Sequence, residues 1–200
     1  MDDNELLKMT AAGDEAAFET LVVKYQARVI RFCYRYVRDM QLAEDIAQEV
    51  FLRIFRYAPQ FEPRASFAAF LFRVATNLCL DTLKIRKRAS RRMPLVSFSS
   101  VKDADGESGS MEDLIPSSAG RPEEISMRAE ELEELSVALD ELPEHHKRAL
   151  MLFELERLSY RDVAEALGAT LPEVKIWIYR ARKKITECVE KKRRSGFTKE

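Results

Sequence analysis

The chain has 200 residues, of which 46% are hydrophobic and 34% charged, with a formal net charge of −1. This length suits one large domain or two small ones, and only six glycines and few alternating β-branched residues argue against a sheet-based fold. No apolar run approaches the roughly 20 residues of a membrane-spanning helix, and the acidic start "MDDNELLKM" does not resemble a signal peptide, so we expect a cytoplasmic protein without membrane insertion of its own.

The small net charge hides a strong segregation of charge along the chain. Residues 84–92 contain six Lys or Arg, and residues 175–194 contain nine basic residues against two glutamates. Between these blocks, residues 101–134 hold eleven acidic residues against three basic ones. The pattern favours two surfaces that face a polyanion, joined by a segment that avoids it. The alternative is a set of ordinary solvated helix faces.

Apolar spacing predicts consecutive helices in the N-terminal part, at about 4–11, 14–36, 42–56 and 67–88, with a turn over 58–66. In "LAEDIAQEVFLRIFR" the apolar residues recur in pairs every fourth position and predict one broad buried face: Leu42, Ala43, Ile46, Ala47, Val50, Phe51, Ile54 and Phe55. The opposite face presents Asp45, Gln48, Glu49, Arg53 and Arg56. No histidine or third carboxylate completes a metal shell there, so an exposed recognition face is preferred to a metal or acid–base site.

The helix from 67 combines three phenylalanines with a basic end. Stacking surfaces beside cationic side chains are what single-stranded DNA requires. Phe67 and Phe72 are nevertheless expected to be core residues. Asn77 is costly inside a helix unless its amide bonds something, so it either contacts a base edge or is a buried structural polar residue.

Beyond residue 94 the composition changes to Ser, Gly, Asp and Pro, which is typical of a flexible tether. Helical periodicity returns near 123 and persists to about 192, with breaks at 142–143, 158–159 and 168. The sequence therefore predicts an all-α protein of two small helical domains joined by a flexible acidic linker. The cysteines, Cys33, Cys79 and Cys188, lack metal-ligand spacing and are expected to be reduced. No cofactor and no metal are expected.

The C-terminal part carries the spacing of a helix-turn-helix. Ala164 is small where two helices cross, Gly168 suits the positive φ of a helix end, and Val174 is β-branched beneath the turn. Ser159 and Thr170 are each predicted to cap a helix, and Pro172 suits a first helical turn. The second helix carries basic and polar residues suited to duplex DNA: Lys175, Tyr179, Arg180, Arg182, Lys183 and Lys184. The alternative is a helical hairpin with a basic outer face.

Four blocks together resemble a known family: "GDEAAFETLVVKY", "AEDIAQEVFLRIFR", "FAAFLFRVATNLCLD" and "ALDELPEHHKRALMLFELERLSYRDVAEALGATLPEVKIWIYRARKKI". In this order and spacing they are similar to the compact two-domain sigma factors of bacterial RNA polymerase, the extracytoplasmic-function (group IV) branch of the sigma-70 family. The resemblance covers nearly the whole chain. Two features depart from the family pattern: Phe70 stands where a tryptophan is common, and the run "PEVKIWI" replaces one like "GTVKSRL".

The resemblance implies roles for particular residues. Contacts to the polymerase clamp helices fall on Asp45, Gln48, Glu49 and Arg53. Capture of the melted −10 element falls on Phe61, Arg64, Phe70, Asn77, Lys84, Arg86, Lys87 and Arg88. Binding of the duplex −35 element falls on Lys175, Ile176, Tyr179, Arg180, Arg182 and Lys183. Trp177 contacts either thymine methyls or sugars, or a protein partner.

The resulting expectation is an alternative sigma factor without catalytic residues, which binds core RNA polymerase and promoter DNA and is controlled by an anti-sigma factor. Its domains are predicted as 1–93 (sigma region 2), 94–128 (linker) and 129–200 (sigma region 4). One rival is a helix-turn-helix regulator that acts without docking on polymerase. A second rival is a nucleic-acid enzyme that uses Asp45, Glu49 and Asp81 with a metal.

Overall fold

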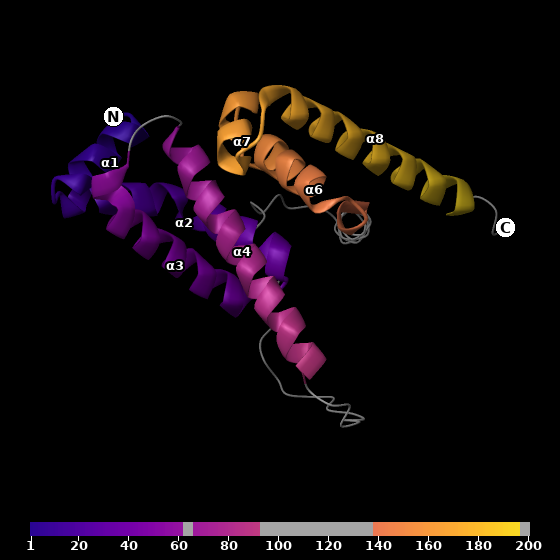
Figure 1. Ribbon diagram of the computed structural model, residues 1–200, viewed down its shortest axis with the longest axis horizontal. Coiled ribbons are helices and arrows are strands. Elements are labelled where there is room, and N and C mark those ends of the chain that lie inside the picture. Colours follow the sequence, from indigo (N-terminus) through magenta and orange to yellow (C-terminus); the bar gives the residue numbers. More distant parts are fainter. Residues whose placement is uncertain (62–65, 93–137, 197–200) are drawn as a thin grey trace, which may run out of the picture. The chain divides into compact units, whose positions relative to one another are not determined.

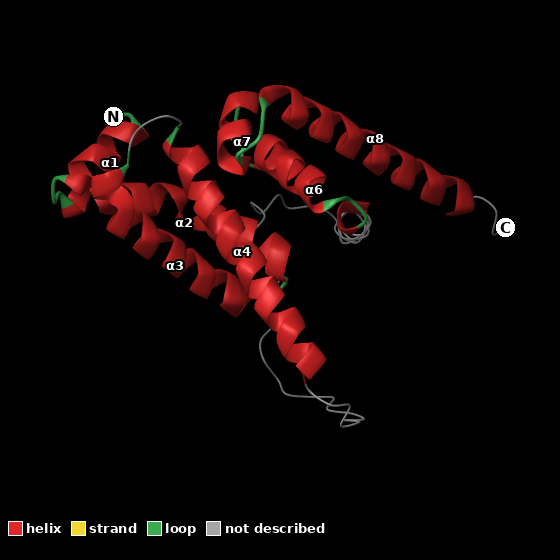
Figure 2. Ribbon diagram, viewed as in Figure 1, coloured by secondary structure: helices red, strands yellow, loops and turns green. Residues whose placement is uncertain are grey.

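The computed structural model describes residues 1–61, 66–92 and 138–196. The chain divides into two compact units, Met1–Ser117 and Ser118–Glu200, and each unit is described by itself. The described residues contain helices and turns and no strand (Figure 2), as expected for an all-α protein. The predicted linker 94–128 and the predicted DNA-binding residue Arg64 both lie outside the described residues.

The N-terminal unit is built from four helices that follow one another along the chain (Figure 1). They are α1 (Asp3–Ala11), α2 (Glu15–Val37), α3 (Met40–Tyr57) and α4 (Phe67–Arg92), with the short 3-10 turn η1 (Ala58–Gln60) after α3. The long helix α2 packs against the other three. Two aspartates fix helix starts, since Asp14 accepts a hydrogen bond from Ala17 N and Asp39 accepts one from Leu42 N.

The core of this unit lies where α2, α3 and α4 meet, and it is rich in aromatic rings. Phe32 of α2 contacts Phe72 of α4 with ring centroids 5.1 Å apart, and Tyr25 contacts Phe67 at 5.2 Å. Phe67 and Phe72 are 1% and 0% exposed. The expectation that these two phenylalanines are core residues is confirmed, and burial of such rings supplies much of the apolar surface that holds the helices together.

The first helix is tied to α2 by one carboxylate. Asp3 accepts a hydrogen bond from the Lys24 ammonium through Oδ1 and one from the Tyr25 hydroxyl through Oδ2, both at 2.6 Å. Burial and then the bond to Asp3 raise the pKa of Tyr25. The phenol therefore stays protonated and keeps donating to Asp3 throughout the physiological range.

The C-terminal unit contains α6 (Glu144–Leu150), a turn of π-helix called η3 (Met151–Leu155), α7 (Tyr160–Leu167) and α8 (Leu171–Gly196). Helix α8 packs against both α6 and α7. Its buried side is made by Val174, Ile178 and Ala181, each at most 1% exposed.

The predicted helix-turn-helix is present between α7 and α8. Gly168 ends α7 in the left-handed conformation, with φ 63° and ψ 36°. Thr170 N donates to Glu173 Oε2 at 2.8 Å and Glu173 N donates to Thr170 Oγ1 at 3.4 Å, which is the predicted capping box. Asp162 N likewise donates to the Ser159 hydroxyl at 3.1 Å at the start of α7. These caps fix where each of the two helices begins.

Candidate protein and nucleic-acid interfaces

The outer face of α3 is polar with one apolar residue at its centre. Asp45 and Gln48 are exposed, while Arg53 Nε donates to Glu49 Oε1 at 2.7 Å along the helix. Leu52 lies on the same face, one turn from both Gln48 and Glu49, and is 50% exposed. Sequence reasoning missed Leu52. The signal in the sequence was that Leu52 is apolar although the helical period places it on the polar face.

The broad buried face predicted for α3 is correct except at its edge. Leu42 is partly exposed and Phe55 is 45% exposed, so its predicted burial is wrong. The reason is that α2 and α4 bury a narrower strip of the α3 surface than the strip that its apolar residues span. Phe55 instead packs at the rim against Phe18 of α2, with ring centroids 5.0 Å apart.

Two predicted DNA-binding aromatics, one shortly before α4 and one near its start, form a pair. The rings of Phe61 and Phe70 lie 5.0 Å apart at an interplanar angle of 39°, and both side chains are partly exposed. The residues between them in the chain, 62–65, lie outside the described part of the structure. The pair offers partly solvated aromatic surface of the type on which an unpaired base stacks.

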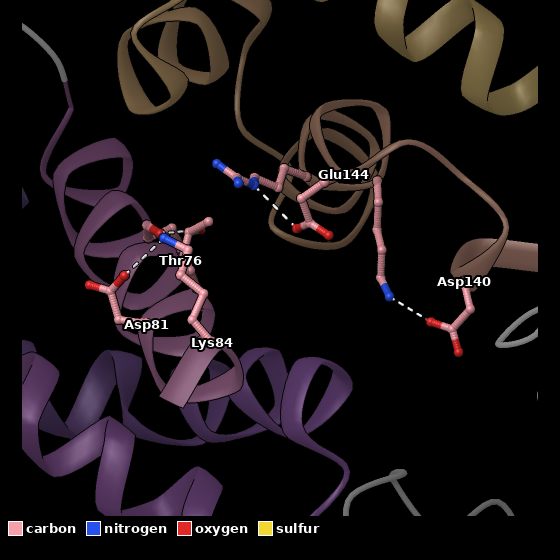
Figure 3. A network of polar contacts seen from close by, with 8 residues as sticks. Thr76, Asp81, Lys84, Asp140 and Glu144 are labelled. Carbon is pink, nitrogen blue, oxygen red and sulfur yellow. Dashed lines mark hydrogen bonds and ion pairs between the residues drawn. The ribbon is translucent and has the colours of Figure 1, made fainter. Parts of the chain in front are cut away.

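The outward face of α4 continues from this aromatic pair. Phe70, Asn77 and Lys84 recur at helical spacing on that face, and both Asn77 and Lys84 are exposed. Asn77 is therefore not a buried structural residue, and its amide is accessible to a ligand. Two turns beyond Asn77, Lys84 Nζ lies 3.2 Å from Asp81 Oδ1 (Figure 3). This pair is well solvated, so it holds the lysine only weakly.

Arg86, near the basic end of α4, is joined to the start of α3. Its Nη2 donates to Asp39 Oδ2 at 2.8 Å, while Asp39 Oδ1 accepts from Leu42 N at 3.0 Å. The hydrogen bond from Arg86 holds the pKa of Asp39 below its ordinary value. Lys87 and Arg88 lie in the same exposed turn of α4. The predicted basic cluster is thus exposed, with Lys84 and Arg86 each paired with a carboxylate.

The outward face of α8 carries most of the residues predicted to bind duplex DNA. Pro172, Ile176, Tyr179 and Lys183 form one exposed stripe at helical spacing, with Ile176 47% and Tyr179 68% exposed. Lys175 and Arg180 flank this stripe and are also exposed. The Lys175 ammonium lies 5.9 Å from the ring centre of Tyr160, at the start of α7.

Arg182 is bound to its own unit, although about half of its side chain remains exposed, at 51%. Its Nε donates to Glu154 Oε1 of η3 at 2.8 Å, and its guanidinium lies 5.3 Å from the ring centre of Phe153. Phe153 in turn packs against Tyr160 at 4.4 Å. Arg182 therefore holds α8 against the preceding turn, within its own unit.

Trp177 is also turned toward its own unit. The indole is partly buried and contacts the ring of His145 on α6, with centroids 5.0 Å apart. The His145 ring contacts His146 at 4.5 Å. His146 is 8% exposed, and burial, followed by the charges of His145 and Arg180, lowers its pKa. Sequence reasoning did not single out either histidine.

The cysteines and carboxylates show no site of another kind within residues 1–61, 66–92 and 138–196. Cys33 and Cys79 are free, fully buried thiols, and the hydrogen bond with Cys33, together with burial, raises the pKa of Cys79. In these ranges no three His, Cys, Asp or Glu side chains gather as metal ligands. No helix in them has the length and apolar character needed to cross a membrane.

Comparison with known families finds one matching family model in each unit. The description "Sigma-70 region 2" matches residues 21–90, and "Sigma-70, region 4" matches residues 132–185. The chain is 32% identical over 94% of its length to RNA polymerase sigma-H factor of Pseudomonas aeruginosa, covering 94% of that protein. It is 30% identical over 95% of its length to the ECF RNA polymerase sigma-E factor of Escherichia coli, covering 95% of that protein.

Two solved structures share the fold. The structure of CnrH in complex with the cytosolic domain of CnrY matches with a TM-score of 0.67 and 21% identity, over 94% of this chain and 97% of that one. The sigma factor RpoE in complex with the anti-sigma factor NepR from Bartonella quintana matches with a TM-score of 0.62 and 20% identity, over 86% of this chain and 96% of that one.

Proposed function

The chain belongs to the extracytoplasmic-function branch of the sigma-70 family of RNA polymerase sigma factors, and we propose how its two helical units divide the work. It is an alternative sigma factor that binds core RNA polymerase and directs initiation at promoters through their −10 and −35 elements. The predicted boundaries assign region 2 to residues 1–93 and region 4 to residues 129–200, with a linker between them.

In this proposal the outer face of α3 docks on the clamp helices of the polymerase. Asp45, Gln48, Glu49 and Arg53 supply the charged and polar contacts. Leu52 adds an apolar anchor among them, because it is half exposed and lies one turn from Gln48 and Glu49. Residues near the centre of an interface, ringed by contacts that exclude water, carry most of the binding energy.

The −10 element is assigned to the turn before α4 and to the outward face of that helix. The Phe61–Phe70 pair provides a stacking surface for a base flipped out of the duplex, and the exposed Asn77 amide provides hydrogen bonds to its edge. Arg64 belongs to the same assignment. The basic end of α4 contacts the DNA backbone at the edge of the melted region through Lys84, Arg86, Lys87 and Arg88.

The −35 element is assigned to α8. The stripe of Ile176, Tyr179 and Lys183 faces the major groove, and Lys175 and Arg180 at its sides contact bases or phosphates. Arg182 was included in this set from the sequence. Its bond to Glu154 supports a role in holding α8 in place, with DNA as a competing partner.

Control by an anti-sigma factor is part of the proposal, because the fold is shared with a sigma factor solved in complex with its anti-sigma factor NepR. The protein is assigned no catalytic activity of its own. It is placed in the cytoplasm, where core polymerase acts.

The observation that carries this function is the exposed α3 face, because a DNA-binding regulator that acts alone does not need it. The test is reconstitution with core bacterial RNA polymerase, measured by co-elution and by run-off transcription from promoters selected from a random library. Co-elution with promoter-dependent run-off supports the assignment. A folded chain that binds duplex DNA and fails to bind core polymerase contradicts it.

A further inference from the structure

Trp177 is the only tryptophan of the chain and stands in the helix assigned to the −35 element. The sequence alone allows it to contact either DNA or a protein partner. The structure offers a third role, because the indole contacts another helix of its own unit.

The side chain of Trp177 extends from α8 and contacts His145 in the first turn of α6. Its indole meets the His145 ring edge-on, at 5.0 Å and an interplanar angle of 64°, and His145 meets His146 at 4.5 Å and 71°. Edge-on contacts at these distances are favourable for aromatic pairs. His146 is buried in α6, and the rings of His145 and Trp177 pack outward from it.

The position of Trp177 around α8 separates it from the DNA-facing stripe. Trp177 immediately precedes Ile178, which is 1% exposed, and lies one turn beyond Val174, which is 0% exposed. Ile176 and Tyr179, by contrast, project from the exposed side of the helix. Trp177 thus borders the buried side of α8, while its neighbours in sequence face outward.

We propose that Trp177 is a positioning residue, which sets the rotation of α8 on α6 through its contact with His145. This inference rests on the proposed −35 role of α8. It explains why a large aromatic residue can replace a polar one in the recognition helix, because the indole is used inside the unit. The DNA-facing residues Ile176, Tyr179 and Lys183 then meet the groove at an angle fixed by this contact.

Other contacts along α8 do not fix the same part of the helix. Arg182 bonds Glu154, and Lys184 lies 3.5 Å from Glu141, but both lie beside Lys183, one to two turns beyond Trp177. In the first two turns, Trp177 contacts the His145 ring, the Lys175 ammonium lies near the Tyr160 ring, and Val174 and Ile178 are buried. Loss of the indole therefore removes a contact that lies between the DNA-facing residues Ile176 and Tyr179 in sequence.

The first test uses the full chain without DNA, with Trp177 emission and its quenching by acrylamide as readouts. His145→Ala should lose shielding of the indole, so that quenching increases, and His145→Phe should restore it because a ring is again present. Thermal unfolding shows that each variant is folded. If His145→Ala leaves emission and quenching unchanged, the contact does not exist in solution and the proposal fails.

The second test measures affinity for a short duplex carrying the −35 element selected by the reconstituted holoenzyme. Trp177→Ala and His145→Ala should each lower affinity about tenfold, the equivalent of about 1.4 kcal/mol. Trp177→Phe and His145→Phe should retain it. The double alanine variant should bind no more weakly than either single variant, because both changes remove one contact. Lys183→Ala is the control that lowers affinity and leaves the emission unchanged.

Two outcomes overturn the inference in different ways. If the duplex shields Trp177 from acrylamide and His145→Ala binds normally, the indole contacts DNA directly. If the wild-type chain and its holoenzyme bind no −35 duplex although the quenching results are as expected, the −35 assignment of α8 fails and the positioning role fails with it. The ring contact alone then survives.

Discussion

Arg86 and Asp39 are 47 residues apart in sequence, yet Arg86 Nη2 donates to Asp39 Oδ2 at 2.8 Å. The other oxygen of the same carboxylate caps α3. One side chain therefore links the start of the proposed polymerase-docking helix to the basic end of the proposed DNA-binding helix. A DNA phosphate that binds Arg86 has to compete with Asp39 for the guanidinium.

Replacing Asp39 by Asn should strengthen binding of the N-terminal unit to promoter DNA. The amide oxygen still caps α3, but the negative charge that competes with phosphate is gone. Because both side chains are well exposed, the gain should be only about twofold. Fluorescence anisotropy with a fork-junction promoter fragment measures it, and Asp39→Ala, which removes the cap as well, serves as the control for helix stability. Weaker binding by Asp39→Asn indicates instead that Asp39 orients Arg86 for DNA.

Leu52→Ala should weaken association with core polymerase by about tenfold or more, since central apolar anchors contribute above about 1 kcal/mol. A titration of labelled core enzyme measures the affinity. Val23→Ala is the matched control, because Val23 is an even more exposed apolar residue, at 75%, on α2, and its removal should change nothing. Equal effects of the two variants contradict the assignment of the docking surface.

The charged part of that surface gives a separate expectation. Asp45→Arg combined with Glu49→Arg should abolish association with core polymerase while the helical content stays that of the wild type, because both side chains lie on the outer face of α3. Circular dichroism and co-elution report the two properties. Normal co-elution of this double variant excludes α3 as the docking helix.

Phe61→Ala should reduce opening of the promoter, because a stacked base is worth about 1–3 kcal/mol and the Phe61–Phe70 pair supplies the stacking surface. Permanganate reactivity of the melted −10 region measures the open complex. Phe70→Trp is the informative partner variant, since it keeps a ring at this place and should retain opening. If Phe61→Ala opens promoters normally, the captured base lies elsewhere.

Arg180 and Arg182 should separate DNA binding from stability. Arg180→Ala removes an exposed cation and should weaken −35 binding by about 1–3 kcal/mol, with the thermal midpoint unchanged. Arg182→Ala removes the bond to Glu154 and the contact with Phe153, and should lower the thermal midpoint of the chain. Duplex affinity and thermal unfolding of the same two proteins decide the matter. A reversed pattern means that the two arginines have been assigned the wrong way round.

The C-terminal unit should lose stability in mild acid because of His146. Burial, His145 and Arg180 lower the pKa of His146 in the folded chain, so the unfolded chain takes up a proton first as the pH falls. Stability is then highest above the ordinary histidine pKa of about 6.5 and decreases as the pH drops below it. Thermal unfolding between mildly alkaline and mildly acidic pH measures the trend, and His146→Gln should flatten it. An unchanged slope in that variant assigns the effect to other groups.

The helices and the helix-turn-helix could be predicted from the sequence because their signals are local. Gly168 and the Thr170–Glu173 box act within a few residues, and the apolar period of α3 identifies its inner face. The errors and omissions concern contacts between elements. The bond from Arg182 to Glu154 and that from Arg86 to Asp39 join distant residues, and the exposure of Phe55 depends on how much of α3 its neighbours cover. No periodicity within one helix contains that information.

The setting of Leu52 within charged neighbours has a kinetic consequence. Charges at the rim of an interface govern how fast partners meet and how strongly salt slows the encounter, whereas a desolvated apolar centre governs how long the complex lasts. On the α3 face these two properties belong to different side chains. Salt should therefore slow the capture of core polymerase with little change in its residence time. Competition with other sigma factors for a limited amount of core enzyme then depends on Leu52, because Leu52 sets the dissociation rate of this sigma factor.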